Sequence, residues 1–308
     1  MRRVGLFLAV LVATSLTAVA AAGASTPAAN SGAADSACVP TEFDGPYTAP
    51  PTGVVTTGLG ADAPAYYEVG RPAGGYYGQP AKGVMLLIHG GAWYAVGKTV
   101  VAAMRNQADR WRNAGWLTVS VDYRGCAQSF DDVLWFMKRI RQNKPNAVVC
   151  ADGFSAGAHL ALLLAAVRPD LACVIANAGP SDFVGLRTQM TPEKGTGVNS
   201  TAGPQKLANF AAAAFGGSVA TVARISPSTH IATVKARVLM ASGQNDVLVP
   251  VAQNRNYALA FRASHPLGYV DVAVLAPGPL LYVHAGVSQS ALDDLHAREN
   301  ALVAPLVG

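Results

Sequence analysis

The segment Gly153-Phe154-Ser155-Ala156-Gly157 restricts the fold of this 308-residue chain more than any other feature. An apolar run precedes it and a second apolar run with helical character follows it, so the serine stands where a strand turns into a helix. A turn this sharp strains the serine backbone, and bulky neighbours would clash there. Glycines on both sides of the serine remove that bulk and leave its hydroxyl exposed at the head of the helix.

Short apolar runs alternate with helical patterns along most of the chain. Several of the apolar runs are continuous, which is typical of parallel strands that are covered on both faces. The alternation predicts an α/β fold with a mostly parallel, eight-stranded sheet and helices on both faces. Strands are predicted at Val54–Thr57, Ala65–Val69, Val84–His89, Leu117–Tyr123, Ala147–Asp152, Leu171–Ala176, Arg237–Ser242 and Tyr269–Leu275. Helices are predicted at Thr99–Asn113, Ser129–Gln142, Ser155–Val167, Gln205–Phe215, Gln253–Ser264 and Gln289–Leu302.

The first 24 residues are typical of a signal peptide. Arg2 and Arg3 are followed by an apolar stretch and by the small residues Ala22-Gly23-Ala24, so cleavage is expected after Ala24 and the protein is expected to be secreted. A membrane anchor is the alternative, but the stretch fades into weakly apolar alanines and threonines, and no stable anchor is expected. Residues 25–53 are rich in Ala, Ser, Thr, Pro and Gly and form an irregular leader to a domain spanning 54–308.

A long insertion interrupts the strand–helix rhythm between Asp182 and Thr229. It holds a Gly/Ser/Thr-rich loop and one predicted helix, with no clear strand. An insertion at the carboxyl edge of such a sheet usually covers a site, whereas a mobile surface loop is the alternative. Phe183 and Phe215 favour a packed cap, and both are expected to contact the substrate.

Charge and cysteine content limit the partners and the compartment. The formal net charge is +5, and loss of Arg2 and Arg3 with the signal segment lowers it to +3, so no nucleic-acid partner is expected. An even number of cysteines in an exported chain favours disulfides, and their spacing lacks the close pairs of a zinc site. No metal or other cofactor is predicted. Three pairings are open. Cys38 with Cys126 is preferred, because Cys126 follows a strand and Cys38 lies in the irregular leader. Cys150 and Cys173 lie in apolar runs, where buried thiols are the alternative.

A free serine needs a base before it can act as a nucleophile, and the base needs a carboxylate that holds its tautomer. His284 follows the last strand in a loop that returns towards the edge where Ser155 emerges, so it is the predicted base. Asp246 follows directly after the strand Arg237–Ser242 and is the predicted acid. Asp182, one strand earlier, is the alternative acid, and capping of a turn is the alternative role for both aspartates.

The segment His89-Gly90-Gly91-Ala92-Trp93 follows another strand. Glycine amides in this segment are unshielded, so they can donate to a negatively charged oxygen beside the N–H of Ala156. A plain tight turn is the alternative. Trp93 and Tyr94 lie next to these amides and, with the cap phenylalanines, are expected to form a modest apolar pocket for the substrate.

The segments "HGGAW", "VSVDYR", "GFSAGAHLA" and "SPSTHI" together resemble the α/β-hydrolase superfamily. They are most similar to the secreted carboxylesterases that include hormone-sensitive-lipase-like and feruloyl-esterase-like enzymes, from about residue 65 to the C-terminus. The resemblance implies the α/β-hydrolase fold and a carboxylesterase activity. It assigns Ser155, Asp246 and His284 as the catalytic triad, and Gly90, Gly91 and Ala156 as the oxyanion hole.

The expected activity is hydrolysis of short- to medium-chain or aromatic carboxylic esters through an acyl-enzyme on Ser155. The partner is then a small-molecule ester. A lipase or amidase of the same fold remains open, as does an inactive binding protein on a hydrolase scaffold.

Overall fold

The computed structural model describes residues 41–42, 54–56, 66–72 and 81–307, apart from 195, 197 and 218. The predicted signal peptide, and the leader except for Thr41–Glu42 (β1), lie outside these residues. β1 pairs in parallel with Ala95–Val96 (β5). Within the described part of the chain, no helix is both long enough and apolar enough to span a membrane.

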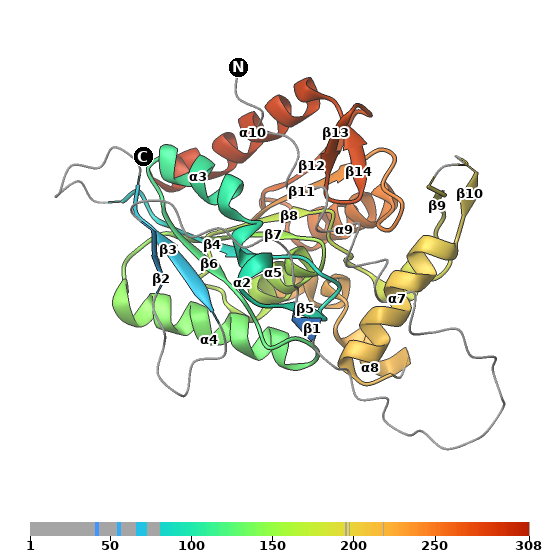
Figure 1. The fold of residues 1–308 in the computed structure, drawn as a ribbon, viewed down its shortest axis with the longest axis horizontal. Helices are drawn as coiled ribbons and strands as arrows, with labels where there is room; N and C mark the ends of the chain where they lie inside the picture. The colour runs from blue at the N-terminus through green and yellow to red at the C-terminus, as the bar shows by residue number, and fades with distance from the viewer. Residues whose placement is uncertain are drawn as a thin grey trace.

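An eight-stranded sheet forms the centre of the molecule and confirms the predicted fold (Figure 1). The strand order is β12-β11-β8-β7-β4-β6-β3-β2. Neighbours from β12 to β6 are parallel, whereas β3 is antiparallel to β6 and to β2. The strands span Val54–Thr56 (β2), Tyr67–Gly70 (β3), Val84–Ile88 (β4), Leu117–Val121 (β6), Val149–Phe154 (β7), Cys173–Asn177 (β8), Arg237–Gly243 (β11) and Val270–Leu275 (β12).

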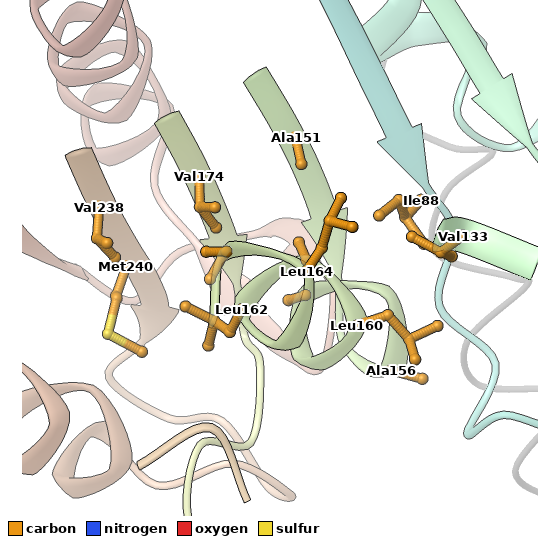
Figure 2. Packing of buried hydrophobic residues seen from close by; sticks show 14 of the residues in the cluster. Ile88, Val133, Ala151, Ala156, Leu160, Leu162, Leu164, Val174, Val238 and Met240 are labelled. Carbon is orange, nitrogen blue, oxygen red and sulfur yellow. The ribbon is translucent and has the colours of Figure 1, made fainter. Parts of the chain in front are cut away.

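Helices cover both faces of the sheet because its central strands are apolar on both sides. Every residue of β4, β7 and β8 is buried. Helices Gln128–Asn143 (α4), Ala156–Val167 (α5) and Val251–Ser264 (α9) pack on one face, and Arg105–Asn113 (α3) and Gln289–Val303 (α10) pack on the other (Figure 1). Figure 2 shows Leu160 on the side of α5 that faces Val133 of α4, and Leu162 on the side that faces Val174 and Met240.

One predicted helix is divided in the structure. The expected helix Thr99–Asn113 consists of Lys98–Ala102 (α2) and α3, with Ala103 and Met104 between them. The apolar spacing continues through both pieces, and nothing in it marks the break. Met104 at the junction is buried in the core on the α3 side of the sheet.

The insertion between β8 and β11 is a packed structure with more elements than the sequence predicted. Its predicted helix begins earlier, at Ala202, and runs to Phe215 (α7), where Gly216 ends it in the left-handed conformation with φ 93°. Two further short helices, Phe183–Leu186 (α6) and Val219–Arg224 (α8), pack with α7. The remaining elements are a pair of antiparallel two-residue strands, Thr191–Pro192 (β9) and Asn199–Ser200 (β10), and the 3₁₀ helix Pro227–Thr233 (η1).

A disulfide joins Cys150 of β7 to Cys173 of β8. The two residues are direct partners in the parallel register, with their Cα atoms 4.6 Å apart. Their interpretation as buried thiols is therefore wrong: both are buried, but they are bonded. Cys126 also takes part in a disulfide, and its preferred partner, Cys38, lies outside the described residues.

Candidate active site

Ser155 lies in the turn from β7 into α5 with φ 54° and ψ −116°. A positive φ strains a residue that carries a side chain, and such strain persists only where the surrounding structure enforces it. Here the two flanking glycines allow the close packing that does so. A Cβ on Gly153 would collide with the carbonyl oxygen of Gly157, and a Cβ on Gly157 would collide with that of Ile88 at the end of β4.

His284 lies in the hairpin formed by Leu280–Tyr282 (β13) and Ala285–Val287 (β14), after the last strand of the sheet. Its Nε2 is 2.9 Å from Oγ of Ser155, and its Nδ1 is 3.2 Å from Oδ2 of Asp246. A carboxylate only accepts hydrogen bonds, so Nδ1 carries the proton and Nε2 accepts from the serine hydroxyl. All three residues are at most 9% exposed, which shields these hydrogen bonds from water.

Asp246 follows β11 and is held by its own loop. Its Oδ1 accepts from the N–H groups of Leu248 and Val249, both at 2.8 Å, which leaves Oδ2 for the histidine. The alternative acid, Asp182, has a different position. It is the N-cap of α6, where its Oδ1 accepts from Val184 N–H at 3.1 Å and Gly185 N–H at 3.0 Å. The structure thus brings Asp246, and not Asp182, to His284.

The hairpin that carries His284 is pressed against the end of β11. A Cβ on Gly243, the last residue of β11, would collide with Cβ of Ala285. Only glycine therefore lets the hairpin approach this closely. The contact fixes the residue next to His284 over the edge of the sheet at which Ser155 emerges.

The segment after β4 reaches the same edge. A Cβ on Gly90 would lie 2.9 Å from the carbonyl oxygen of Phe154 and 3.2 Å from Cβ of Ser155, so this glycine permits close contact with the serine turn. Ala156 supplies the first amide of α5, and the first amides of a helix have no partner within it. The structure places Gly90 against the serine turn, with Gly91 next in the chain and Ala156 after the serine.

Gly91, Ala92 and Trp93 all have positive φ, at 119°, 52° and 66°. Glycine adopts a positive φ without strain, but Ala92 and Trp93 carry side chains, so their conformation requires anchors. The carbonyl oxygen of Gly91 accepts from the amides of Tyr94 and Ala95 at 3.1 and 3.0 Å. His89 anchors the start of the segment, because its Nε2 lies 3.1 Å from Oδ1 of Asp122. Asp122 stands in the "VSVDYR" segment, but no role was predicted for it.

The expected apolar pocket residues fall into two groups. Trp93 and Phe183 are fully buried, with ring centroids 5.6 Å apart, and present no surface to a substrate. This differs from the expectation that they line a pocket, because the strained segment turns the indole inwards onto α5. Tyr94 and Phe215 are partly exposed. Phe215 packs on Trp93 at 5.8 Å, and the Tyr94 hydroxyl donates to the carbonyl oxygen of Phe210 in α7 at 3.4 Å.

His159 lies in the helix that follows Ser155, but other contacts hold it away from the serine. It is fully buried in α5 beside Trp93, Phe183 and Phe215. Its Nδ1 accepts from the Trp93 indole, and its Nε2 donates to the carbonyl oxygen of Ile225 at 2.8 Å. Burial lowers its pKa to about 4, so the ring is neutral at physiological pH.

The described residues contain no group of three or more His, Cys, Asp or Glu side chains arranged to hold a metal ion. A hydroxyl that donates to a carboxylate-oriented imidazole, beside unshielded amides, suits attack on a carbonyl carbon.

Known structures share the fold at low sequence identity. A puromycin-hydrolyzing peptidase of Mycobacterium tuberculosis matches with TM-score 0.64 and 15% identity over 84% of this chain. An esterase of Pyrococcus furiosus matches with TM-score 0.60 and 14% identity, covering 89% of this chain and 99% of the esterase. A carbohydrate esterase from gut microbiota matches with TM-score 0.57 and 17% identity, covering 77% of this chain and 91% of the esterase. The chain spans only 40% of the peptidase's length.

No curated protein sequence matches the chain at a significant level. The model of the BD-FAE family, however, matches residues 77–260, which is more than half of the chain. The matched range contains the glycine segment after β4, the serine turn and Asp246. This chain therefore belongs to the BD-FAE family of feruloyl esterase-like α/β-hydrolases.

Proposed function

We propose that this esterase-type hydrolase is a secreted serine carboxylesterase that acts on short- to medium-chain or aromatic carboxylic esters. The observation that carries the proposal is the unbroken line of hydrogen bonds from Asp246 through His284 to Ser155, with donor–acceptor distances of 3.2 and 2.9 Å. Both imidazole nitrogens are used, one for orientation and one for the serine. This is the division of roles that a general base requires.

In the proposed reaction, Ser155 Oγ bonds to the ester carbonyl carbon as its proton passes to His284 Nε2. The carbonyl oxygen becomes an oxyanion, and the amides of Gly90, Gly91 and Ala156 are the proposed donors to it. Collapse of this intermediate breaks the bond to the alcohol, which leaves with the proton from His284. Water then attacks the acyl-enzyme and gives a proton to His284. Collapse of the second intermediate releases the acid, and His284 passes that proton to Ser155 Oγ.

The proposed substrate range rests on two partly exposed aromatic residues, one beside the glycine segment and one in the insertion. Tyr94 and Phe215 are partly exposed on the side where α7 packs against the glycine segment. Aromatic side chains suit an apolar or aromatic acyl group. The family name and the carbohydrate esterase among the structural neighbours agree with an ester substrate. Secretion is supported by the basic and apolar start of the chain and by the disulfide between Cys150 and Cys173.

The test compares Ser155→Ala with Ser120→Ala, which removes a buried hydroxyl from β6. Both are assayed on p-nitrophenyl esters from C2 to C12, on an aromatic ester and on a matched anilide, and labelled with a fluorophosphonate. We expect Ser155→Ala to lose labelling and to lose ester turnover by about 10⁶-fold, as removal of the nucleophile does in subtilisin. Ser120→Ala should retain both.

Retention of ester hydrolysis by Ser155→Ala would exclude the proposed nucleophile. If the wild-type protein is labelled but cleaves only the anilide, the protein is an amidase. If it is neither labelled nor active on any of these compounds, the scaffold serves binding instead.

A further inference from the structure

A buried carboxyl group lies in the strand that leads to Ser155. Asp152 is fully buried in β7, among apolar residues. Its Oδ2 accepts from Gln107 Nε2 at 2.5 Å and from Trp111 Nε1 at 2.8 Å, and its Oδ1 accepts from Asn177 Nδ2 at 2.8 Å. All three partners donate, so the Asp152 carboxyl accepts in each of these hydrogen bonds. A carboxyl placed at such cost in a core requires full hydrogen bonding, which it has.

Asn177, the last residue of β8, links this carboxyl to the catalytic serine and to the histidine hairpin. Its backbone oxygen accepts from the N–H of Ser155 at 2.8 Å. Its side-chain Nδ2 must face Asp152, because the carboxylate only accepts. Its Oδ1 therefore faces the other way, where it accepts a short hydrogen bond from the hydroxyl of Tyr282. The orientation of one amide group is thus set by a hydrogen-bond acceptor on the neighbouring strand.

Tyr282 is the last residue of β13 and stands two positions before His284. Its ring packs on Phe154, the residue before Ser155, with centroids 6.1 Å apart. The hydroxyl and the ring of Tyr282 therefore both hold the hairpin to the serine strand. Val283 lies between Tyr282 and His284 with φ 51°, so the chain turns sharply from this anchor into the histidine.

The far end of the network is an arginine–glutamate pair, which lies away from the serine. Arg110 of α3 forms a buried ion pair with Glu299 of α10. Gln107, which donates to Asp152, also lies 3.5 Å from Oε1 of Glu299. The network therefore joins the helices on one face of the sheet to the strand ends at the site.

We propose that Tyr282 and Asn177 are positioning residues that hold His284 Nε2 within hydrogen-bonding distance of Ser155 Oγ. Tyr282 clamps the hairpin to β8, and Asn177 joins that clamp to the backbone of the serine itself. The proposal rests on the proposed serine esterase function. Neither residue touches the reacting atoms, so their effect passes entirely through the geometry of the serine–histidine pair. A displacement of about 1 Å at a reacting pair can lower a rate on the order of 10²-fold.

The test is Tyr282→Phe, with Tyr257→Phe as a matched control. Tyr257 is a buried tyrosine in α9, and its hydroxyl makes no hydrogen bond within the described part of the chain. Each variant loses one buried hydroxyl and keeps its ring. We expect Tyr282→Phe to lower kcat and the rate of fluorophosphonate labelling by about tenfold or more with KM within twofold, and Tyr257→Phe to leave both unchanged. Equal rates in the two variants would overturn the proposal.

A second measurement separates positioning from general stability. In a His284→Ala background no imidazole remains to be positioned, so adding Tyr282→Phe should not lower the residual activity further. A further tenfold loss there would show that the tyrosine acts on the fold as a whole and would overturn the proposal.

The same set of variants separates this inference from the proposed function. Full activity in His284→Ala or Ser155→Ala would remove the proposed function itself. Inactivity of those two variants, together with a fully active Tyr282→Phe, would leave the function standing and remove only the role of Tyr282.

Discussion

The indole Nε1–H of Trp93 donates to Nδ1 of His159 at 3.1 Å, so the strained segment after β4 is hydrogen-bonded to the helix that begins after Ser155. The acceptor nitrogen must be unprotonated for this bond to exist. His159 Nε2 meanwhile donates to the carbonyl oxygen of Ile225, just after α8. One neutral histidine therefore connects two parts of the chain. These are the segment after β4, which holds the proposed oxyanion donors Gly90 and Gly91, and the insertion between β8 and β11.

This burial predicts a pH dependence of stability. The pKa of His159 is lowered to about 4 in the folded protein and returns to 6.5 on unfolding. Between these values the unfolded chain binds the additional proton, so the free energy of unfolding falls as pH falls from about 6.5 to about 4. The contribution approaches about 3 kcal/mol below that range. Urea unfolding from pH 4 to 8 measures it.

His159→Gln should flatten this dependence, because an amide can accept from Trp93 and donate to Ile225 without titrating. His230→Gln, which changes a partly exposed histidine, is the control. Burial also raises the pKa of Glu299 to about 8, which gives a slope of the opposite sign between pH 4.5 and 8. The difference between wild type and variant at each pH therefore carries the test, and identical curves for wild type and His159→Gln would contradict the prediction.

Asp246→Asn should lower kcat by about 10⁴-fold while leaving the fold intact, because an amide that donates to His284 selects the wrong tautomer. Asp182→Asn is the matched control, since an asparagine oxygen can still cap α6. Both are measured by ester hydrolysis and by unfolding midpoint. A severe loss of kcat in Asp182→Asn, together with a fully active Asp246→Asn, would show that Asp182 and not Asp246 is the catalytic acid.

The two cap phenylalanines should behave differently. Phe215 is partly exposed, so Phe215→Ala should shift kcat/KM by about tenfold towards longer acyl chains. Phe183 is fully buried against Trp93 and His159, so Phe183→Ala should destabilise the fold by about 3–5 kcal/mol and leave the chain-length profile unchanged. Chain-length profiles from C2 to C12 and urea midpoints decide this. The reverse pattern would show that Phe183 reaches the substrate.

At most buried valines, replacement by glycine should give a less stable protein than replacement by alanine. At Val283 the glycine variant should not be the less stable of the two. In regular backbone an Ala-to-Gly change costs about 0.5–1 kcal/mol, but a side chain at positive φ costs about 1–2 kcal/mol that glycine avoids. With φ 51° at Val283, Val283→Gly should therefore be at least as stable as Val283→Ala. At Val287, a buried residue of β14, the glycine variant should be the less stable of the pair. Urea midpoints of the four variants provide the comparison.

The parts of the molecule that could be predicted are those with local signals. Continuous apolar runs predicted the strands. The serine turn needs its glycines within two residues of the serine, so the five residues from Gly153 to Gly157 were enough to predict it. Ser155, Asp246 and His284 each follow a predicted strand, and this placed all three at the same edge of the sheet. The geometry that joins them, including the hydrogen bond from His284 to the serine, is visible only in the structure.

Features that depend on register or on side-chain direction could not be predicted. The bond between Cys150 and Cys173 requires that β7 and β8 are neighbours and that these two residues are direct partners. Trp93 is buried and its indole is hydrogen-bonded to His159, 66 residues further along the chain. The polar residue Asn177 at the end of an apolar strand was a signal for the positioning network, but its partner Tyr282 lies 105 residues away.

The side chains of the triad come from three connections of the sheet, after β7, after β11 and after β12, and the insertion between β8 and β11 supplies none of them. The three residues and the insertion are thus encoded in separate stretches of the gene. Residues 182–229 can be exchanged between members of the family without altering Ser155, Asp246 or His284. Grafting this single contiguous stretch therefore tests whether it sets the substrate preference.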